Sequence, residues 1–365
     1  MIEQKEIFEI IEGYDKDNIS IAVLASHSAL QILKGAKEMG FHTIAVCKAG
    51  REMVYERFGV ADKIISVKDY KEFVSDRVLD ELRAHNSILI PHGSLVAYVG
   101  VKNIEEKLKI PFFGTRGILR WESDRTMERD WLETSKIKLP KEFKDPSEID
   151  RLCLIKFPGA RGGRDYFLAR TPKSYKKKTD KLFKEGKISQ DDIDNVTIQE
   201  YISGVNMYVS YFYSPLKDEV ELFGMDRRYE SNIDGVTRIS AVDQIELYGD
   251  PRFVPSYVVA GNFPLVVRES LLDKIFKMGD SVVKVSKDIC PPGMIGAFCL
   301  EAMVNDKLDL IVFEISARIV AGTNPYIQGS PYSYIMYGDN MSMGKRIALE
   351  IKNAVESGQL DKLVT

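Results

Sequence analysis

A lysine, three glycines and two arginines lie close together in the segment KFPGARGGRDYF, residues 156–167. The segment joins two apolar stretches, LCLI and YFLA, that are typical of strands. Glycines let the backbone turn and approach a ligand closely, so its N–H groups could surround phosphate oxygens. The segment has neither the Gly-Lys-Ser/Thr of a P-loop nor the Gly-x-Gly-x-x-Gly of a dinucleotide fold. It therefore predicts a glycine loop between two strands that belongs to neither of these two motifs and whose task the segment alone does not give.

Two glutamates, Glu301 and Glu314, stand inside apolar strands on either side of the turn-forming segment VNDKLD. An unpaired carboxylate at such a position is costly. If the turn is Asn305–Leu308, Glu301 lies opposite Val312, and Glu314 is a diagonal neighbour on the same face, roughly 7–8 Å away. A three-residue turn would put the two on opposite faces. Two carboxylates on one face can share Mg²⁺ with phosphate oxygens; alternatively, nearby arginines such as Arg318 neutralise them.

The first part of the chain alternates strands and helices. The strands ISIAVLAS, HTIAVCK, KIISV and SILIP, with helices between them, predict a parallel sheet covered by helices on both faces. Ligands of such sheets bind beyond the carboxyl ends of the strands, where 26–28 (Ser-His-Ser) and 92–94 (His-Gly-Ser) lie. A helix follows each segment, so its first N–H groups could bind a phosphate. Alternatively, Ser28 and Ser94 are ordinary N-caps.

The alternation stops after a charged helix expected at about residues 122–134. A basic run, SYKKKTDKLFKEGK, predicts a helix that leaves Tyr175, Leu182 and Phe183 to pack. Two strands are expected around Gly204, followed by a strand-rich region with helices near 268–289 and 343–357. This part of the chain therefore has an α+β pattern.

Composition limits the functional class. A chain of 365 residues with 44% hydrophobic and 29% charged residues is expected to form two or three packed domains of a soluble protein. A net charge of −3 argues against nucleic-acid or anionic-membrane binding. No apolar run approaches the roughly 20 residues of a membrane span, and the start lacks signal-peptide features. The scattered cysteines Cys47, Cys153, Cys290 and Cys299 are expected to be reduced, in a cytoplasmic protein. The sequence has no His-Glu-x-x-His motif, which argues against a zinc enzyme.

Taken together, these motifs resemble the ATP-grasp ligases. A strand lysine with a glycine-rich loop is followed by QEYISG, a glutamate and the Glu-x-x-x-Arg of EISAR. Within that superfamily, the chain resembles the archaeal formate-dependent FAICAR synthetases of purine synthesis along essentially its whole length, through SHSALQILKGAKEMGF, PHGS, ILRWES, MDRRYESNIDG and PPGMIG. The resemblance implies an N-terminal α/β doubly wound domain (1–118). A two-lobed α+β ATP-grasp domain (119–356) would follow, with a glycine-loop lobe at about 140–200 and a C-terminal lobe at about 201–356.

The resemblance also implies a role for specific residues. Those implied to bind ATP are Lys156, Gly159, Ala160, Arg161, Gly162, Gly163, Gln199, Glu200, Tyr201, Ile202 and Glu230. Glu301 and Glu314 would hold Mg²⁺ or Mn²⁺, and His27, Ser94 and Asn262 would contact the ribonucleotide AICAR. Lys156 and Arg318 would stabilise charge on the transferred phosphoryl group. Two departures from the pattern stand out: Ser316 replaces an asparagine that is often a third metal ligand, and Asp165 replaces a common glycine.

The implied reaction is the ATP- and formate-dependent formylation of AICAR to FAICAR through formyl phosphate, in a protein expected to be a homo-oligomer. Two alternatives stay open at this point. One is an ATP-grasp ligase that joins another carboxylate and another amine. The other is a non-catalytic paralogue that binds purine nucleotides; the retained Lys156, Glu301 and Glu314 favour an enzyme.

Overall fold

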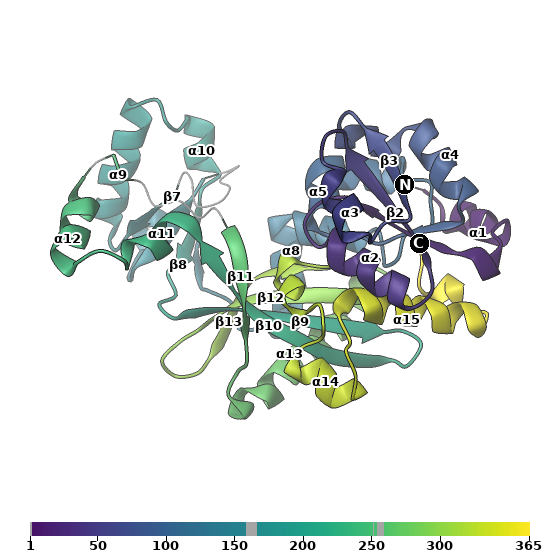
Figure 1. Ribbon diagram of the computed structural model, residues 1–365. Helices are drawn as coiled ribbons and strands as arrows, with labels where there is room; N and C mark the ends of the chain where they lie inside the picture. The colour runs from purple at the N-terminus through teal and green to yellow at the C-terminus, as the bar shows by residue number, and fades with distance from the viewer. Residues whose placement is uncertain (1, 158–165, 251, 254–258) are drawn as a thin grey trace.

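The computed structural model describes residues 2–157, 166–250, 252–253 and 259–365, apart from the side chains of residues 230, 231 and 233. Three β-sheets organise this part of the chain. Figure 1 shows the N-terminal sheet at the upper right, a five-stranded sheet in the centre and a smaller sheet at the upper left. The predicted fold class, a doubly wound α/β domain followed by a two-lobed α+β unit, is confirmed.

The N-terminal sheet is parallel, with strand order β3-β2-β1-β4. Ile21 and Val23 of β1 lie in one apolar cluster, whereas Ala22 and Leu24 lie in another. Because both faces are buried, the strands read as continuous apolar runs. The elements of this region are α1 (Gln4–Glu12), β1 (Ser20–Leu24), α2 (Ala29–Glu38), β2 (His42–Lys48), α3 (Met53–Phe58), β3 (Lys63–Val67), α4 (Asp76–Ala84), β4 (Ser87–Leu89), α5 (Gly93–Val99) and α6 (Val101–Glu106).

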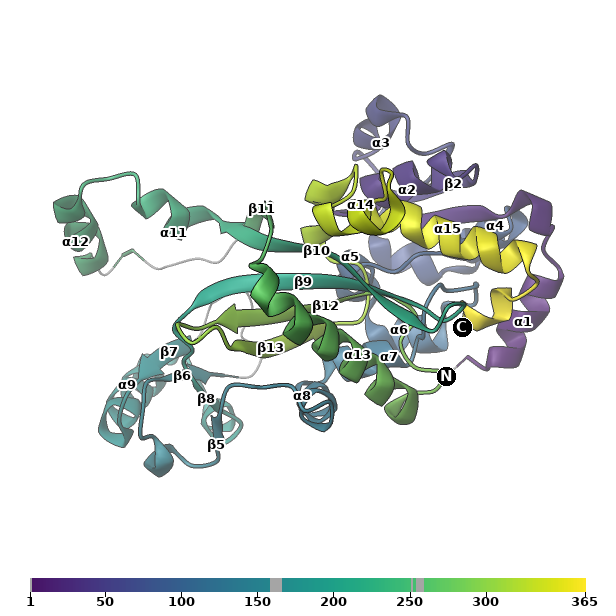
Figure 2. The same cartoon turned by 90° about the horizontal axis from the view of Figure 1, so that it is seen from below.

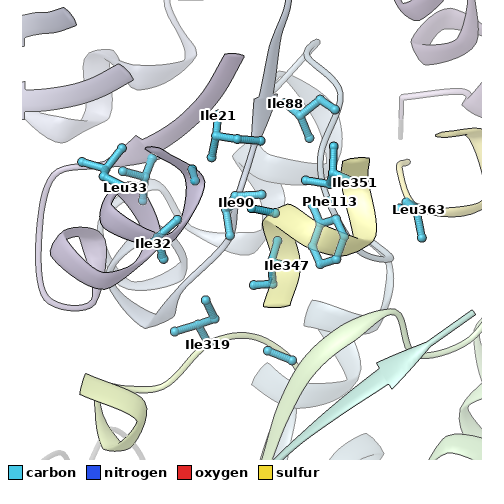
Figure 3. Close-up of a cluster of buried hydrophobic side chains, with 14 of the residues drawn as sticks. Ile21, Ile32, Leu33, Ile88, Ile90, Phe113, Ile319, Ile347, Ile351 and Leu363 are labelled. Carbon is cyan, nitrogen blue, oxygen red and sulfur yellow. The ribbon is translucent and has the colours of Figure 1, made fainter. Parts of the chain in front are cut away.

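A helix from the far end of the sequence, α15 (Met343–Glu356), packs on this sheet beside α2. Glycines allow the contact: a Cβ at Gly35 would lie 2.1 Å from the backbone N of Lys345, and Gly344 lies equally close to α2. Figure 3 shows the shared core, which includes Ile21, Ile32, Ile88, Ile90, Ile347 and Ile351. Chain after residue 340 therefore completes the N-terminal core, and the division of the chain at residue 118 stays a prediction.

The five-stranded sheet is antiparallel, with strand order β11-β10-β9-β12-β13. One face packs against α13 and α8 through an apolar cluster in which the rings of Tyr211 and Phe298 stack at 4.8 Å. Figure 2 shows α13 running along this sheet. The elements are α8 (Arg125–Thr134), β9 (Val205–Ser214), β10 (Glu219–Glu230), β11 (Val259–Leu265), α13 (Leu272–Ile289), β12 (Gly296–Val304) and β13 (Leu310–Ser316).

The smaller sheet is antiparallel, with strand order β5-β8-β6-β7. Its elements are β5 (Glu142–Phe143), β6 (Cys153–Lys156), β7 (Tyr166–Ala169), α9 (Pro172–Lys184), α10 (Gln190–Asp194) and β8 (Thr197–Glu200). In α9, Tyr175 is buried and Leu182 packs against the same cluster, as expected, but Phe183 is 47% exposed. The expectation for Phe183 was wrong because one residue turns a helix by about 100°, away from the buried stripe.

The remaining helices are α7 (Ile118–Ser123), α11 (Ser231–Val236), α12 (Ala241–Gly249) and α14 (Pro331–Tyr337), with short 3₁₀ turns that include η5 (Ala321–Tyr326). The four cysteines are free thiols. Within the described ranges, no helix has the length and apolar character needed to cross a membrane.

Candidate active site

A β-bulge places Glu301 and Glu314 side by side on one face of the five-stranded sheet. The turn between β12 and β13 spans residues 305–309, one residue longer than expected. With regular pairing beyond Ala302–Val312, Glu301 would lie opposite Phe313, and Glu314 would face away. Phe313 is instead an extra residue in β13, so Glu301 pairs directly with Glu314. The two carboxylates share a face, as expected, but the bulge is the reason.

The two glutamates differ in their surroundings. Glu301 is 2% exposed, whereas Glu314 is exposed, contrary to the expectation that both are buried. Glu301 Oε1 accepts a hydrogen bond of 2.7 Å from Arg228 Nη2, while Glu301 Oε2 is buried without a hydrogen-bond partner in the described part of the chain. Burial and then the charge of Glu314 raise the pKa of Glu301 to about 8. A buried carboxylate oxygen without a donor beside a second carboxylate is a suitable ligand pair for a hard cation.

The described residues supply only part of a coordination shell. Among the described residues, no group of three or more His, Cys, Asp or Glu side chains is arranged to hold a metal ion. Ser316, at the position of the missing asparagine, is buried. Mg²⁺ commonly takes one or two carboxylates and completes its shell with water and substrate phosphates. The donor set therefore fits a cation that binds together with a nucleotide.

Arg318 is tied to a different glutamate from the one expected. Its Nη2 lies 2.9 Å from Glu122 Oε1, and Glu122 Oε2 accepts a hydrogen bond of 2.8 Å from the backbone N of Ala317. Glu128 likewise accepts one of 2.7 Å from the backbone N of Ile315, and burial, followed by Glu314, raises its pKa to about 9. Helices α7 and α8 thus cover the outer edge of β13. The alternative of arginine neutralisation holds for Glu301, but through Arg228.

A cavity of about 290 Å³ lies between the smaller sheet and the five-stranded sheet. Lys156 Nζ donates a hydrogen bond of 3.0 Å to Gln199 Oε1 on its wall, and Gln199 Nε2 donates one of 3.3 Å to Glu142. Burial, assisted by Arg125, lowers the pKa of Lys156. The lining residues are Arg125, Thr126, Glu128, Arg129, Asp130, Leu132, Leu139, Pro140, Glu142, Lys156, Thr197, Gln199, Val312, Phe313 and Glu314. A cation and an amide thus stand opposite the strand that carries Glu314.

The expected nucleotide site includes residues outside the described part of the chain. Gly159, Ala160, Arg161, Gly162, Gly163 and Asp165 lie outside the described residues, and so does the side chain of Glu230, at the end of β10. Glu200 ends β8 and holds Arg151 at 3.1 Å, while Tyr201 and Ile202 begin the link from β8 to β9. Of the expected hinge, Gln199 lines the cavity.

A second cavity, of about 490 Å³, lies between the polar face of the five-stranded sheet and the N-terminal domain. His27 and Asn262, expected to contact the ribonucleotide, line it together with Arg228, Arg318, Glu301 and Glu314. Glu314 lines both cavities. Glu314 therefore borders both spaces, and Glu301 borders the second one, so a ligand in either cavity would lie near the glutamate pair.

The carboxyl ends of β1 and β4 are adjacent, because the two strands pair in parallel. The rings of His27 and His92 lie 5.6 Å apart, and a Cβ on Gly93 would lie 3.3 Å from the Arg318 guanidinium carbon. Burial and then Arg318 lower the pKa of His27, so its imidazole is uncharged near neutral pH. The chain after β4 thus lies against Arg318, which follows β13 of the five-stranded sheet.

Neither serine acts as an ordinary N-cap. Ser28 precedes α2 with a left-handed φ of 72° and makes no side-chain capping bond, and α5 is capped by His92, whose Nδ1 accepts from the Ser94 backbone N at 3.2 Å. His92 Nε2 is 2.8 Å from the Leu24 carbonyl oxygen. A carbonyl can only accept, so His92 carries its proton on Nε2. Ser94 itself is buried, and the adjacent Gly93 lines the cavity.

Sequence reasoning missed four charged residues at these cavities. Arg228 pairs with Glu301, Asp226 binds Asn262, and Glu122 and Glu128 cap the edge of β13. One signal was available in MDRRYE, where charges at alternate positions of a strand share a face. That pattern indicates a polar sheet face but does not give the partners.

Two family models match the chain. One is described as a domain of unknown function, DUF1297, over residues 174–365, and the other as a protein of unknown function, DUF1246, over residues 21–143. Together they leave little of the sequence unmatched, but neither description gives an activity.

Named relatives are more informative. The 5-formaminoimidazole-4-carboxamide-1-(beta)-D-ribofuranosyl 5′-monophosphate (FAICAR) synthetase of Methanobrevibacter smithii is 52% identical over 100% of this chain and 99% of its own length. The crystal structure of the IMP biosynthesis protein PurP of Thermococcus kodakaraensis is 29% identical, with a TM-score of 0.72 over 94% of this chain and 100% of that one.

A more distant structure shares the fold. The biotin carboxylase domain of the 2-oxoglutarate carboxylase of Hydrogenobacter thermophilus, solved with MgADP, ADP and bicarbonate, is 16% identical, with a TM-score of 0.59 over 90% of this chain and 69% of that one. The smaller sheet and the five-stranded sheet have the ATP-grasp fold, and the parallel N-terminal sheet precedes them in the sequence. With a relative half identical along its entire length, the chain belongs to the family of FAICAR synthetases.

Proposed function

We propose that the protein converts ATP, formate and AICAR to ADP, phosphate and FAICAR, a step of purine biosynthesis. The observation that carries this proposal is the arrangement of two cavities that meet at Glu314, one reaching Lys156 and the other His27 and Asn262. A nucleotide in the first cavity and an amine substrate in the second would present their reacting groups to each other beside the glutamate pair. Membership of the FAICAR synthetase family supports AICAR as that amine.

The chemistry requires activation of formate, because its carboxylate would otherwise have to expel oxide. A formate oxygen attacks the γ-phosphorus of ATP, the bond from that phosphorus to ADP breaks, and formyl phosphate forms. The exocyclic amine of AICAR then attacks the formyl carbon, loses a proton, and expels phosphate with the former formate oxygen. The protein mainly orients these groups and stabilises charge on the moving phosphoryl group.

Each assigned residue has a task in this scheme. Lys156, with residues 159–163, would hold the ATP phosphates, and residues 199–202 with Glu230 would hold the adenosine end. Glu301 and Glu314 would bind Mg²⁺ or Mn²⁺, which neutralises phosphate charge when bound. Arg318, fixed by Glu122, would face the transferred phosphoryl group. His27, Ser94 and Asn262 would bind AICAR.

Arg228 is our candidate for holding formate. Its side chain lines the cavity next to Glu301, and its guanidinium carbon lies over the ring of Tyr208, 4.2 Å from the ring centre. Only one of its Nη atoms is used by Glu301 in the bond described above. A guanidinium matches a carboxylate in geometry and charge. Formate bound there would lie beside the metal-binding glutamates, where the γ-phosphoryl group has to arrive.

An isotope experiment tests the intermediate. With formate labelled with oxygen-18 in both positions, we expect the label in the inorganic phosphate released, because the formate oxygen becomes the bridging atom of formyl phosphate. Mass spectrometry of the phosphate measures it, with unlabelled formate as the control. FAICAR formed with unlabelled phosphate would exclude the intermediate.

The same assay separates the alternatives. Turnover with another carboxylate or amine in place of formate or AICAR would indicate a different ligase, and nucleotide binding without turnover of any tested pair would indicate a non-catalytic paralogue.

A homo-oligomer is also proposed: the exposed side chains of Val242, Ile245 and Tyr248 give α12 an apolar face that a second copy could cover. Sedimentation velocity measures this state. A location in the cytoplasm stays a prediction.

Replacing His27 with alanine should weaken AICAR binding by roughly tenfold to a hundredfold, the usual loss of one hydrogen bond to a charged group. Binding of a non-hydrolysable ATP analogue should not change. Calorimetry with each ligand measures both, and His42→Ala, which removes an exposed histidine from the opposite end of the same sheet, is the control. Equal AICAR affinities of the two variants would place the ribonucleotide away from this strand end.

A further inference from the structure

Asp226 places a carboxylate in the wall of the larger cavity. Its residue is 1% exposed, and its Oδ1 is buried without a hydrogen-bond partner in the described ranges. Its Oδ2 accepts a hydrogen bond of 2.7 Å from Asn262 Nδ2. Such a position is costly for a carboxylate, and burial raises the pKa of Asp226 to about 6. At neutral pH, which is above this pKa, the Asp226 carboxylate is therefore mostly ionised. Its hydrogen-bond partner among the described residues is Asn262.

The backbone at Gly322 packs directly against the Asp226 carboxylate. Gly322, in η5, approaches so closely that a Cβ there would lie 1.8 Å from Asp226 Oδ1. Asp226 on β10 and Asn262 on β11 lie on adjacent strands, in a register that pairs Asp226 with Pro264 and Arg228 with Asn262. Their contact is thus a diagonal cross-strand pair held by the sheet. There is no room for a side chain at residue 322, and this close backbone packing restricts the position of the Asp226 carboxylate.

Chemistry then determines the orientation of the Asn262 amide. An ionised carboxylate can only accept hydrogen bonds, so Asn262 must turn its NH₂ group toward Asp226. The carbonyl Oδ1 of Asn262 is consequently the atom left for a ligand in the cavity that this residue lines. An oxygen acceptor there suits an N–H or O–H donor and repels a phosphate.

The position of Asn262 in the sheet narrows the choice of donor. Three strand spacings separate β11 from β12, which carries Glu301, so at about 4.8 Å each the two backbones lie roughly 14 Å apart. The reacting amine of AICAR must approach the γ-phosphoryl group near Glu301 and Glu314. Asn262 therefore meets a part of the ribonucleotide that does not react.

We propose that Asp226 is a positioning residue that holds the Asn262 amide so that its carbonyl oxygen accepts a hydrogen bond from a non-reacting donor of the ribonucleotide. The donor is the carboxamide N–H or a ribose hydroxyl. This inference rests on the proposed function, because it takes AICAR as the occupant of the cavity. It assigns to the Asp226–Asn262 pair the recognition of the sugar–base part of the substrate, and excludes its phosphate as the ligand of Asn262.

Calorimetry with three ligands tests the proposal without requiring turnover. The ligands are AICAR, its analogue with a 4-carboxylate in place of the carboxamide, and its 2′-deoxy analogue. Asp226→Asn preserves the shape but lets the Asn262 amide rotate, so we expect AICAR to bind about tenfold more weakly, as for one hydrogen bond. The analogue that lacks the recognised donor should bind the wild-type protein about tenfold more weakly than AICAR, and this difference should largely disappear in Asp226→Asn.

A swapped pair sharpens the test. In the double variant Asp226→Asn with Asn262→Asp, residue 226 donates and residue 262 again offers only acceptors to the cavity, so AICAR affinity should return to within about threefold of wild type. Asn262→Asp alone puts two carboxylates together and should bind poorly. Melting temperatures and binding of an ATP analogue should remain close to wild type in Asp226→Asn, as in the control Asp309→Asn, which alters an ion pair with Lys138.

The outcomes separate this inference from the proposed function. If the 4-carboxylate analogue loses its penalty in Asp226→Asn, the donor is the carboxamide; if the 2′-deoxy analogue does, the donor is the ribose hydroxyl. Unchanged AICAR affinity in Asp226→Asn, or unchanged penalties for both analogues, overturns the positioning role while leaving the enzyme's function intact. A wild-type protein that does not bind AICAR overturns both.

Discussion

Replacing Glu301 with glutamine will lower the rate of FAICAR formation by about a thousandfold or more. Glutamine keeps the size of the side chain but removes the charge of a carboxylate that pairs directly with Glu314 and has a buried oxygen without a donor among the described residues. Together, Glu301 and Glu314 are proposed to hold the cation that neutralises the ATP phosphates. Such a cation stabilises the transition state by several kcal/mol, and each 1.36 kcal/mol changes the rate tenfold. Glu314→Gln should have a similar effect.

Folding should survive this change, because the glutamine Oε1 can still accept the hydrogen bond from Arg228, and the lost charge of Glu301 also removes its repulsion from Glu314. These two effects and the loss of the Arg228–Glu301 ion pair oppose each other, so the melting temperature of Glu301→Gln should stay close to that of the wild-type protein without metal. The control is Glu219→Gln, which alters an exposed carboxylate on β10 and should leave the rate unchanged. A rate for Glu301→Gln within tenfold of wild type, measured by FAICAR formation at saturating ATP and Mg²⁺, would refute the metal assignment.

The glutamate pair also illustrates what the sequence can predict. Apolar runs interrupted by Glu301 and Glu314 indicate two strands with functional carboxylates, since a charge inside such strands needs a reason. The register of these two strands was not predicted correctly, because the turn has one residue more than expected and Phe313 is an extra, bulged residue in β13. Each change alone would have put the glutamates on opposite faces, and together they cancel. Turn length and bulges depend on packing between distant elements, which strand patterns do not encode.

The alternation of strands and helices along the sequence was sufficient to predict the N-terminal sheet. Its strands are apolar on both faces and separated by amphipathic helices, a pattern with few other solutions than a covered parallel sheet. The placement of α15 on that sheet was not predictable, because it depends on the close approach of Gly35 and Gly344 in helices far apart in sequence. A glycine in a helical sequence does not indicate which other helix packs closely against it.

Partners of charged residues were the least predictable feature of the site. Arg318 is near Glu314 in sequence, so the alternative to a metal site named it as the residue that neutralises the glutamates, but it binds Glu122 on α7. The arginine that pairs with Glu301 is Arg228, on a strand that is separated from β12 by β9. Long side chains reach across one strand or more, so sequence proximity is a poor guide to ion pairs.

Replacing Arg228 with glutamine should lower kcat/KM for formate by about a hundredfold to a thousandfold. Removing one member of a buried charge pair usually costs about 2–5 kcal/mol, part of which comes from the partner left unpaired, here Glu301. The formate carboxylate would lose its guanidinium as well. Arg228→Lys should recover only part of the loss, because an ammonium is a point charge without the two parallel donors that match a carboxylate. Initial rates at varied formate, with ATP and AICAR saturating, measure the effect.

The neighbouring arginine provides the control. Arg227 precedes Arg228 on β10, so its side chain points to the opposite side of the strand, where it is exposed and lies 3.8 Å from Asp234. Arg227→Gln removes the same charge from the same strand and should leave kcat/KM for formate nearly unchanged. A second measurement separates formate binding from an effect through Glu301: if Arg228 acted only by orienting that glutamate, higher Mg²⁺ would restore the rate of Arg228→Gln. We expect high formate to restore much of it and high Mg²⁺ to restore little. An unchanged KM for formate in Arg228→Gln would assign the carboxylate to another part of the cavity.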